Sequence, residues 1–328
     1  MESLFFAINT VAPIMLTVII GYLLKKKHFI DGGFAKAANK LVFRVFLPSM
    51  LFLNIYNIED ITETNFSFIF YAATMLIVIF LLSLPLVIML TKVPSRRGVL
   101  LQATFRSNYA LIGIPLAESL FENDGVIIAT LLSAVFIPML NILAVISLSA
   151  FGASDKKPSV KNILLDIVKN PLIESIVLGL LAVAVRYLFI RYGIEFRLSD
   201  ITPVYTVLGY LKNLATPIAL LMLGAQFEFS AISSLKKEII FGTLMRTVFV
   251  PSLCIGIAYF VFGNVFEGAH FAAFVAAFAT PVAVSSVPMS QEMGGDVALS
   301  GQIVVWTTVC SAGTIFIASF LLKLAGVF

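Results

Sequence analysis

The sequence predicts an all-α polytopic membrane protein with ten transmembrane helices, arranged as two inverted five-helix repeats in which helices 4 and 9 are broken. Three observations predict this fold. The composition is 60% hydrophobic and only 12% charged, the chain divides into ten long apolar stretches, and prolines recur at matching places in the two halves.

The composition excludes an ordinary soluble domain. A soluble chain of 328 residues with a mean hydropathy of +1.03 would expose apolar patches large enough to aggregate, whereas a bilayer solvates apolar faces directly. The net charge of +4 is too diffuse for nucleic-acid binding and fits basic cytoplasmic loops. Cys254 and Cys310 lie in apolar stretches and predict neither a disulfide nor a metal site.

A helix that crosses the hydrocarbon core needs roughly 20 mostly apolar residues. The segment near 40–57 is the weakest candidate because it is short and carries Arg44. Lysines follow rather than precede the first apolar run, so we expect a retained span and not a cleavable signal peptide. The ten candidates lie near 5–24, 40–57, 66–91, 98–120, 126–151, 171–190, 201–226, 238–262, 270–291 and 297–325.

Charges between the spans predict the orientation. Lysine and arginine gather after the first, third, fifth and seventh spans, which places those loops in the cytoplasm and both termini outside. One predicted outer loop does not follow this pattern, because it has three arginines, Arg186, Arg191 and Arg197. The basic residues of the predicted inner loops are Lys25, Lys26, Lys27, Lys36, Lys40, Lys92, Arg96, Arg97, Lys156, Lys157, Lys161, Lys169, Lys236 and Lys237.

The repeat predicts the domain organisation. An odd number of spans in each half inverts the second half relative to the first. We therefore expect a first repeat at 1–151, a cytoplasmic linker at 152–170 and a second repeat at 171–328. Prolines support the pairing, because Pro48 corresponds to Pro217 and Pro85 to Pro251.

Further prolines predict breaks in the fourth and ninth spans. Gly113 and Pro115 interrupt the fourth span, where proline deprives the carbonyl of Leu111 of its helical partner; Pro281 and Pro288 act in the same way in the ninth. A freed carbonyl is tolerable at membrane depth only against protein, water or solute. The alternative is a simple kink packed against neighbouring helices.

A broken helix directs the N-terminus of its second half at the gap, and that end attracts anions. Two such ends from antiparallel spans would favour a carboxylate. Serine and threonine also bond to their own helix backbone, so each hydroxyl alone is weak evidence. The polar candidates at the breaks are Ser107, Asn108, Thr280, Ser285 and Ser286.

Four basic residues fall inside the predicted spans. Arg106 lies roughly 12 Å along the fourth span at a rise of 1.5 Å per residue. At that depth it either faces a cavity or a partner, or it extends its charge to the cytoplasmic interface. Arg106 and Asn108 can share one site only if the backbone bends between them. For Arg246 we favour extension to the interface. Lys212 and Arg44 are expected near span ends.

Several chemistries are absent from the sequence. There is no phosphate-binding loop, dinucleotide fingerprint or HExxH motif, and the two histidines, His28 and His270, lie near span ends. No pair of carboxylates sits mid-span for acid–base catalysis. We expect no enzyme activity and no cofactor, and the sequence does not distinguish H⁺ from Na⁺ as a coupling ion.

The fourth span also carries a resemblance. The string RSNYALIGIPLAESLFENDG resembles the signature of the auxin efflux carrier family, with its N-x-x-x-x-G-[IL]-P core at Asn108, Gly113, Ile114 and Pro115. TPIALLMLGAQFE resembles the family's seventh span, and Ala279 to Thr308 its ninth and tenth. The resemblance covers essentially the whole chain.

This resemblance implies the fold shared with bile-acid sodium symporters, in which spans 1, 2, 6 and 7 form a scaffold and the others a moving core. It also implies that Asn108, Pro115 and Pro281 lie at a crossover of spans 4 and 9. Family substrates are organic anions, auxin in plants and malate or malonate among bacteria, and the short central loop resembles bacterial members.

We therefore expect a secondary carrier for a small mono- or dicarboxylate, working by alternating access in a bacterial inner membrane. Its expected partners are the organic anion, the lipid bilayer and possible second copies in a homodimer, with no nucleic acid. A carrier of auxin-like or other amphipathic acids, a carrier of neutral solutes and a channel remain alternatives.

Overall fold

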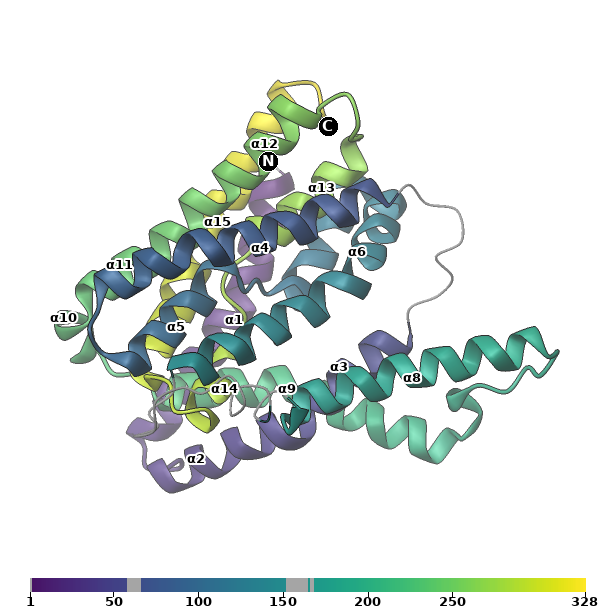
Figure 1. Ribbon diagram of the computed structural model, residues 1–328. Coiled ribbons are helices and arrows are strands. Elements are labelled where there is room, and N and C mark those ends of the chain that lie inside the picture. Colours follow the sequence, from purple (N-terminus) through teal and green to yellow (C-terminus); the bar gives the residue numbers. More distant parts are fainter. Residues whose placement is uncertain (1, 58–65, 152–164, 166–167) are drawn as a thin grey trace.

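The computed structural model describes residues 2–57, 66–151, 165 and 168–328, with side chains from residue 12 onward. Helices make up this part of the chain, and its extended pairing is a single bridge between Ser107 and Val282. Figure 1 shows a tilted bundle from which α8 (Pro171–Arg191) and α9 (Thr202–Ala225) project toward the lower right of the view. The predicted linker at 152–170 falls largely outside the described residues.

Two sets of helices correspond to the two halves of the chain. The first set is α1 (Glu2–Lys26), α2 (Gly32–Leu41), η1 (Val42–Phe46), α3 (Leu47–Tyr56), α4 (Ser67–Leu90), α5 (Pro94–Phe105), η2 (Tyr109–Gly113) and α6 (Ile114–Phe151). After α8 and η3 (Leu198–Asp200), the second set continues with α9, α10 (Ala231–Ser234), α11 (Lys236–Leu244), η4 (Met245–Phe249), α12 (Val250–Phe262), α13 (Gly268–Phe278), α14 (Ser286–Glu292) and α15 (Val297–Leu324).

The chain is an integral membrane protein by the length and apolarity of its helices. Among the described residues, seven helical segments are long and apolar enough to cross a bilayer. These segments are Gly32–Tyr56, Ser67–Leu90, Tyr109–Phe151, Pro171–Arg191, Thr202–Ala225, Lys236–Phe262 and Val297–Leu324.

The predicted fourth and fifth spans meet inside α6. Phe121 (φ −146°, ψ 28°) and Glu122 (φ 47°, ψ −136°) leave the helical conformation there, so α6 consists of two helices joined by a sharp turn. The turn lies between the predicted ranges 98–120 and 126–151, and it returns the chain toward the end from which α5 begins.

Two groups of helices pack against each other, and α1 of the first group also packs on α15 of the second. In the first, α1 packs on α9, and α3 packs on both α8 and α9; in the second, α5 and α13 pack on α6, while α11, α14 and α5 contact α15. The helix α13 is central, since every residue from Phe271 to Ala279 is buried. A helix buried on all sides belongs to the interior of a bundle.

Small residues bring α1 and α9 close together. A Cβ atom added to Gly21 would lie 2.1 Å from the carbonyl oxygen of Leu221, and one added to Gly224 would lie 1.9 Å from that of Val18. Only glycine permits this approach. Membrane helices gain much of their association energy from such close backbone packing, so α1 and α9 form a rigid pair beside the site.

Candidate functional site

The broken fourth and ninth segments cross each other at their breaks. The helix α5 ends at Phe105, and Arg106 follows with extended backbone angles (φ −79°, ψ 102°). The Asn108 amide donates to the carbonyl of Pro281 at 2.8 Å, and the Ala283 amide donates to that of Arg106 at 3.3 Å. Two short antiparallel extended segments, paired at the Ser107–Val282 bridge, thus satisfy one another's backbone in the middle of the bundle.

The break in the fourth segment lies earlier than the sequence predicts. It occupies residues 106–108, whereas Gly113 closes the π-helical turn η2 and Pro115 lies in the first turn of α6. The helix resumes at Tyr109 and runs continuously through η2 into α6, so Pro115 lies inside it and not at its start. Pro115 still removes the α-helical partner of the Leu111 carbonyl, and the π-helical turn directly before it is the local adjustment of the backbone at this proline.

In the ninth segment, α13 ends at Phe278 and α14 begins at Ser286. Pro281 lies within the break, as predicted, and Pro288 lies in the first turn of α14. The Ala277 carbonyl, which Pro281 deprives of a helical partner, accepts a hydrogen bond from Arg246 at 2.9 Å.

Arg246 stabilises both breaks from within the protein. Its side chain is 0% exposed, so extension to the interface is wrong. Its Nε donates to the carbonyl of Thr280 at 2.8 Å, Nη1 to that of Phe105 at 3.3 Å and Nη2 to that of Ala277 at 2.9 Å. One guanidinium therefore caps the C-terminal ends of α5 and α13, where helix dipoles favour a positive charge.

Arg106 is also buried, but its surroundings differ. The residue is 2% exposed and lines a small internal cavity. Of the two expectations for Arg106, the cavity-facing cation is therefore confirmed, and extension to the interface is wrong. Its Nη2 donates to Asn141 Oδ1 at 3.0 Å and to Ser285 Oγ at 2.9 Å, Nη1 contacts Gln102 Oε1 at 3.3 Å and the sulfur of Met289, and Nε has no partner among the described residues. Every one of these partners is neutral, so the charge is uncompensated.

Sequence reasoning missed the two amides that hold Arg106. Asn141 donates its own amide to the carbonyl of Ile137 at 2.9 Å, which turns Oδ1 toward Arg106. Gln102 donates to Ser290 Oγ at 3.0 Å and links α5 to α14. The detectable signal was a lone asparagine within the apolar 126–151 segment.

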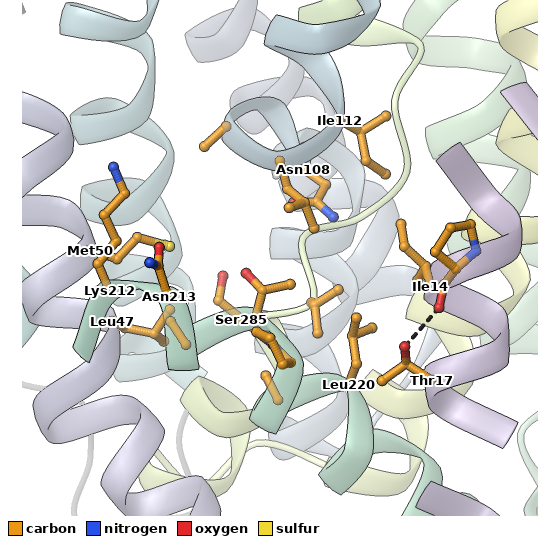
Figure 2. Close-up of a pocket in the computed structure, with 18 of the residues that line it drawn as sticks. Ile14, Thr17, Leu47, Met50, Asn108, Ile112, Lys212, Asn213, Leu220 and Ser285 are labelled. Carbon is orange, nitrogen blue, oxygen red and sulfur yellow. Dashed lines mark hydrogen bonds between the residues drawn. The ribbon is translucent and has the colours of Figure 1, made fainter. Parts of the chain in front are cut away.

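The crossover opens into two adjoining cavities. The larger has a volume of about 570 Å³ and the smaller about 50 Å³. Figure 2 shows Asn108 and Ser285 between Lys212 of α9 on one side and Thr17 of α1 on the other. Six residues line both cavities, namely Leu47, Met50, Asn54, Asn108, Ala110 and Ser285.

Four of the predicted site residues come together here. Arg106 and Ser107 line the smaller cavity, and Asn108 and Ser285 line both. The bend at residues 106–108 is what lets Arg106 and Asn108 face one space.

The other six predicted residues line neither cavity. The Thr280 hydroxyl donates to the Ala276 carbonyl at 2.8 Å, within the end of its own helix. A Cβ atom on Gly113 would lie 3.0 Å from the carbonyl oxygen of Ala276, so this glycine lets η2 pack on α13. The six residues are Gly113, Ile114, Pro115, Thr280, Pro281 and Ser286.

Lys212 lines the larger cavity. It lies ten positions after the first residue of α9, Thr202, which corresponds to roughly 15 Å along the helix. Its expected location near a span end is therefore wrong. Among the described residues, neither cavity is lined by aspartate or glutamate.

A polar cluster closes one end of the site. Asn39 of α2 donates to Gln226 Oε1 at 2.8 Å and to Gln291 Oε1 at 3.1 Å, and Gln226 Nε2 donates to the same Gln291 oxygen at 3.1 Å. Gln291 Nε2 donates to the Lys36 carbonyl at 3.1 Å. We name Asn39, Gln226 and Gln291 the amide latch; it joins α2 and the end of α9 to α14.

Next to the latch, Arg44 lies 3.5 Å from Glu292, with its side chain 61% exposed. The cavity-lining residues of α9 lie between 212 and 220, in the middle and later part of the helix Thr202–Ala225. The latch thus closes the end where α9 finishes, and the cavity lies at the level of the middle of α9.

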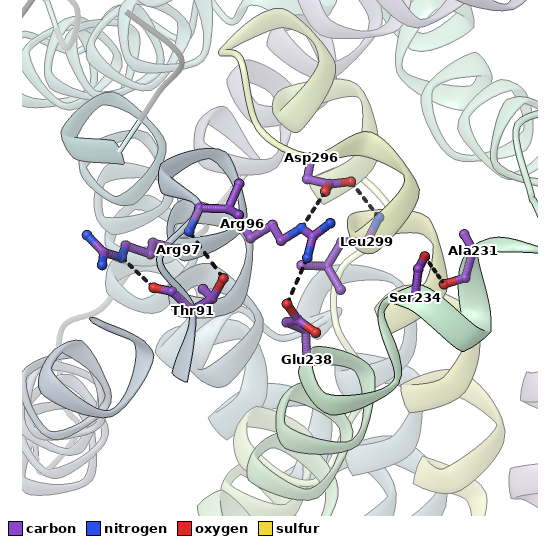
Figure 3. Close-up of polar contacts among 9 residues, drawn as sticks. Thr91, Arg96, Arg97, Ala231, Ser234, Glu238, Asp296 and Leu299 are labelled. Carbon is purple, nitrogen blue, oxygen red and sulfur yellow. Dashed lines mark hydrogen bonds and ion pairs between the residues drawn. The ribbon is translucent and has the colours of Figure 1, made fainter. Parts of the chain in front are cut away.

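An ion cluster holds the second helix group together at the same end. Arg96 donates to Glu238 of α11 at 2.9 Å and to Asp296, the N-cap of α15, at 3.1 Å (Figure 3). Burial lowers the pKa of Arg96, but the bonds to the two carboxylates outweigh it and raise the pKa overall. Arg96 therefore stays charged and ties α5, α11 and α15.

Buried crossing breaks beside a polar cavity in an apolar bundle define the class of protein, a membrane transporter. Comparison with known proteins agrees. The model of the membrane transport protein family matches residues 6–319, and the chain belongs to this family, which confirms the resemblance to auxin efflux carriers. It is also 22% identical over 321 residues to an uncharacterized transporter of Methanothermobacter thermautotrophicus, covering 92% of this chain and 94% of the relative.

Proposed function

We propose that the protein is a secondary carrier for a small organic anion, a mono- or dicarboxylate, bound at the crossover. The uncharged surroundings of Arg106 carry this proposal. An isolated buried cation is unfavourable by several kcal/mol unless a counter-charge accompanies it, and no described carboxylate lies within ion-pairing distance. A transported anion would supply that charge.

Further features support an anion. Asn108 is the N-cap of the η2–α6 helix and lines both cavities, so the positive end of this helix faces the same space. The Ser107 hydroxyl is buried, lines the smaller cavity and has no partner among the described residues. A carboxylate would accept from such donors.

We propose that all ten predicted segments cross the membrane as two inverted repeats, in a bacterial cell membrane with both termini outside. The antiparallel crossing at the Ser107–Val282 bridge supports the inversion. The lysine-rich ends of α1 and α2 lie at the amide latch, which would then be cytoplasmic. The loop charges at 58–65 and 152–164 lie outside the described residues.

In this orientation the latch closes the cytoplasmic side, and we propose that the cavity opens on the outer side. Alternating access then requires the latch to open as the helix group of α1, α3, α8 and α9 moves against the other. The latch suits this role because its amide–amide hydrogen bonds are each worth only about 0.5–1.5 kcal/mol.

The membrane potential sets the energetic direction. Each net charge moved is worth roughly 2.3 kcal/mol per 100 mV. With a negative interior, export of an anion needs no coupling ion, whereas uptake needs H⁺ or Na⁺ to accompany it.

Thermal unfolding of the purified protein tests the proposal, because a ligand that binds only the folded state raises the melting temperature with its concentration. We expect carboxylates to raise it and neutral amino acids or cations to leave it unchanged. Arg106→Gln and Asn108→Ala should abolish the shift, whereas Lys323→Gln, which removes an exposed charge at the end of α15, should retain it. A shift with neutral or cationic solutes alone would overturn the anion proposal.

A further inference from the structure

The larger cavity has a charged wall opposite the crossover. Lys212 lines it from α9, whereas Asn108 and Ser285 line it from the two broken segments. No described acidic residue forms an ion pair with Lys212. The cavity system therefore contains a second cation without a counter-charge.

Lys212 lies on the protein-facing side of α9. Ala215 and Ala219, three and seven positions further on, are buried and line the same cavity, so one helical face carries all three residues. The opposite face presents Val207, Tyr210 and Leu214, which are exposed apolar side chains suited to lipid. A lysine placed at this depth on the cavity face is a functional position rather than an interfacial anchor.

The two cavities adjoin, because they share lining residues from α3, the crossover and Ser285, the N-cap of α14. Among the described residues, the charged residue that lines the smaller cavity is Arg106, the one that lines the larger is Lys212, and no acidic residue lines either. One bound carboxylate would neutralise one of these two charges, and the other would remain unpaired in a low-dielectric environment.

We propose that Lys212 is a specificity-determining residue that binds the second anionic group of a dianionic substrate whose first carboxylate lies at Arg106. The inference rests on the proposed function, since it presumes an anion at the crossover. A dicarboxylate spanning the two cavities satisfies both cations at once, and a monocarboxylate satisfies only one.

This arrangement also connects binding to movement. Arg106 belongs to the crossover and Lys212 to α9, which packs with α1 and α3 in the other helix group. A dianion bound between them links the two groups across the cavity. The bound dianion moves with the crossover only after its contact with Lys212 is broken. Lys212 therefore acts on substrate selection while the site is open to the outer side.

Matched ligands test the proposal. Isothermal titration of the purified full chain compares malonate, succinate and glutarate with propionate, butyrate and valerate, which have equal carbon counts and one carboxylate fewer. A charge-assisted contact of ordinary strength corresponds to about 10- to 100-fold in affinity. We expect the best dicarboxylate to exceed its partner by such a factor, Lys212→Gln to remove the advantage, and monocarboxylate affinity to stay unchanged.

Two further variants keep the test decisive. Lys212→Arg preserves the charge and should retain most of the preference, and Lys212→Met serves as the neutral variant if Lys212→Gln fails to fold. Equal loss of both ligand classes in the neutral variants, or no loss of either, would overturn the role of Lys212 while leaving the anion carrier intact. If no carboxylate binds the wild-type chain, the proposed function itself is wrong.

Discussion

Replacing Arg246 by methionine should destabilise the fold more than any other single charge removal within the spans. The guanidinium holds the carbonyls of Phe105, Ala277 and Thr280, all at helix ends that proline or the crossover has deprived of their usual donors. Methionine fills similar space and donates nothing. The three carbonyls would then remain buried without a partner.

The size of the effect follows from these contacts. A buried acceptor left unsatisfied costs about 1–3 kcal/mol, which gives an upper bound of roughly 9 kcal/mol for three. Burying methionine instead of a guanidinium recovers part of the desolvation penalty. We therefore expect a loss of about 3–5 kcal/mol, or a decrease in melting temperature of roughly 5–10 °C for a chain of this size.

Thermal unfolding in detergent, without ligand, measures the change. Arg44→Met is the matched control, since Arg44 is 61% exposed and its ion pair with Glu292 spans 3.5 Å; such a pair contributes at most about 1 kcal/mol. Arg246→Lys should fall between the two, because an ammonium keeps the charge and loses the fork that reaches three carbonyls. A melting temperature of Arg246→Met equal to that of Arg44→Met would refute the reasoning.

Two further outcomes are expected at the latch end. Gln291→Ala removes the hydrogen bonds to Asn39, Gln226 and the Lys36 carbonyl. In a Cys310→Ser background, this change should increase by at least about tenfold the rate at which the cysteine of Ser285→Cys is labelled from the cytoplasmic side. An unchanged labelling rate would contradict a gating role for the latch. Arg96→Met should lower the free energy of unfolding by about 1–3 kcal/mol, because it leaves the largely buried Glu238 unpaired; unchanged denaturant unfolding would show that the cluster contributes nothing.

The sequence predicted the helices well, because hydropathy and proline positions report directly on where a chain can cross a membrane. The predicted segment 66–91 is the helix Ser67–Leu90, and 171–190 is Pro171–Arg191. It also predicted that Arg106 and Asn108 share a site only through a bend. The location of that bend was missed, since a proline that follows a π-helical turn inside a continuous helix looks the same in sequence as one that breaks a helix.

The roles of the basic residues could not be predicted from depth alone. Hydropathy gives a position along a helix axis but not which neighbouring helix faces it. Arg246 and Arg106 both lie deep, yet one meets carbonyls of α5 and α13 and the other meets Asn141. Lys212 faces the cavity because α9 is oriented by its glycine contact with α1, a tertiary fact that no local pattern of α9 contains.

The difference between the two arginines separates folding from binding. Carbonyls at helix ends are permanent acceptors favourably oriented toward a cation, so the guanidinium of Arg246 is held by three hydrogen bonds in every state in which α5 and α13 remain folded. Arg106 lines a cavity and its Nε has no partner among the described residues, so an anionic ligand that enters and leaves would complete its interactions. Loss of Arg246 should therefore act on unfolding with or without carboxylate, whereas loss of Arg106 should act mainly on the ligand-dependent part of stability. Because the two guanidinium groups share no hydrogen-bond partner among the described residues, the two effects on ligand-free stability should add.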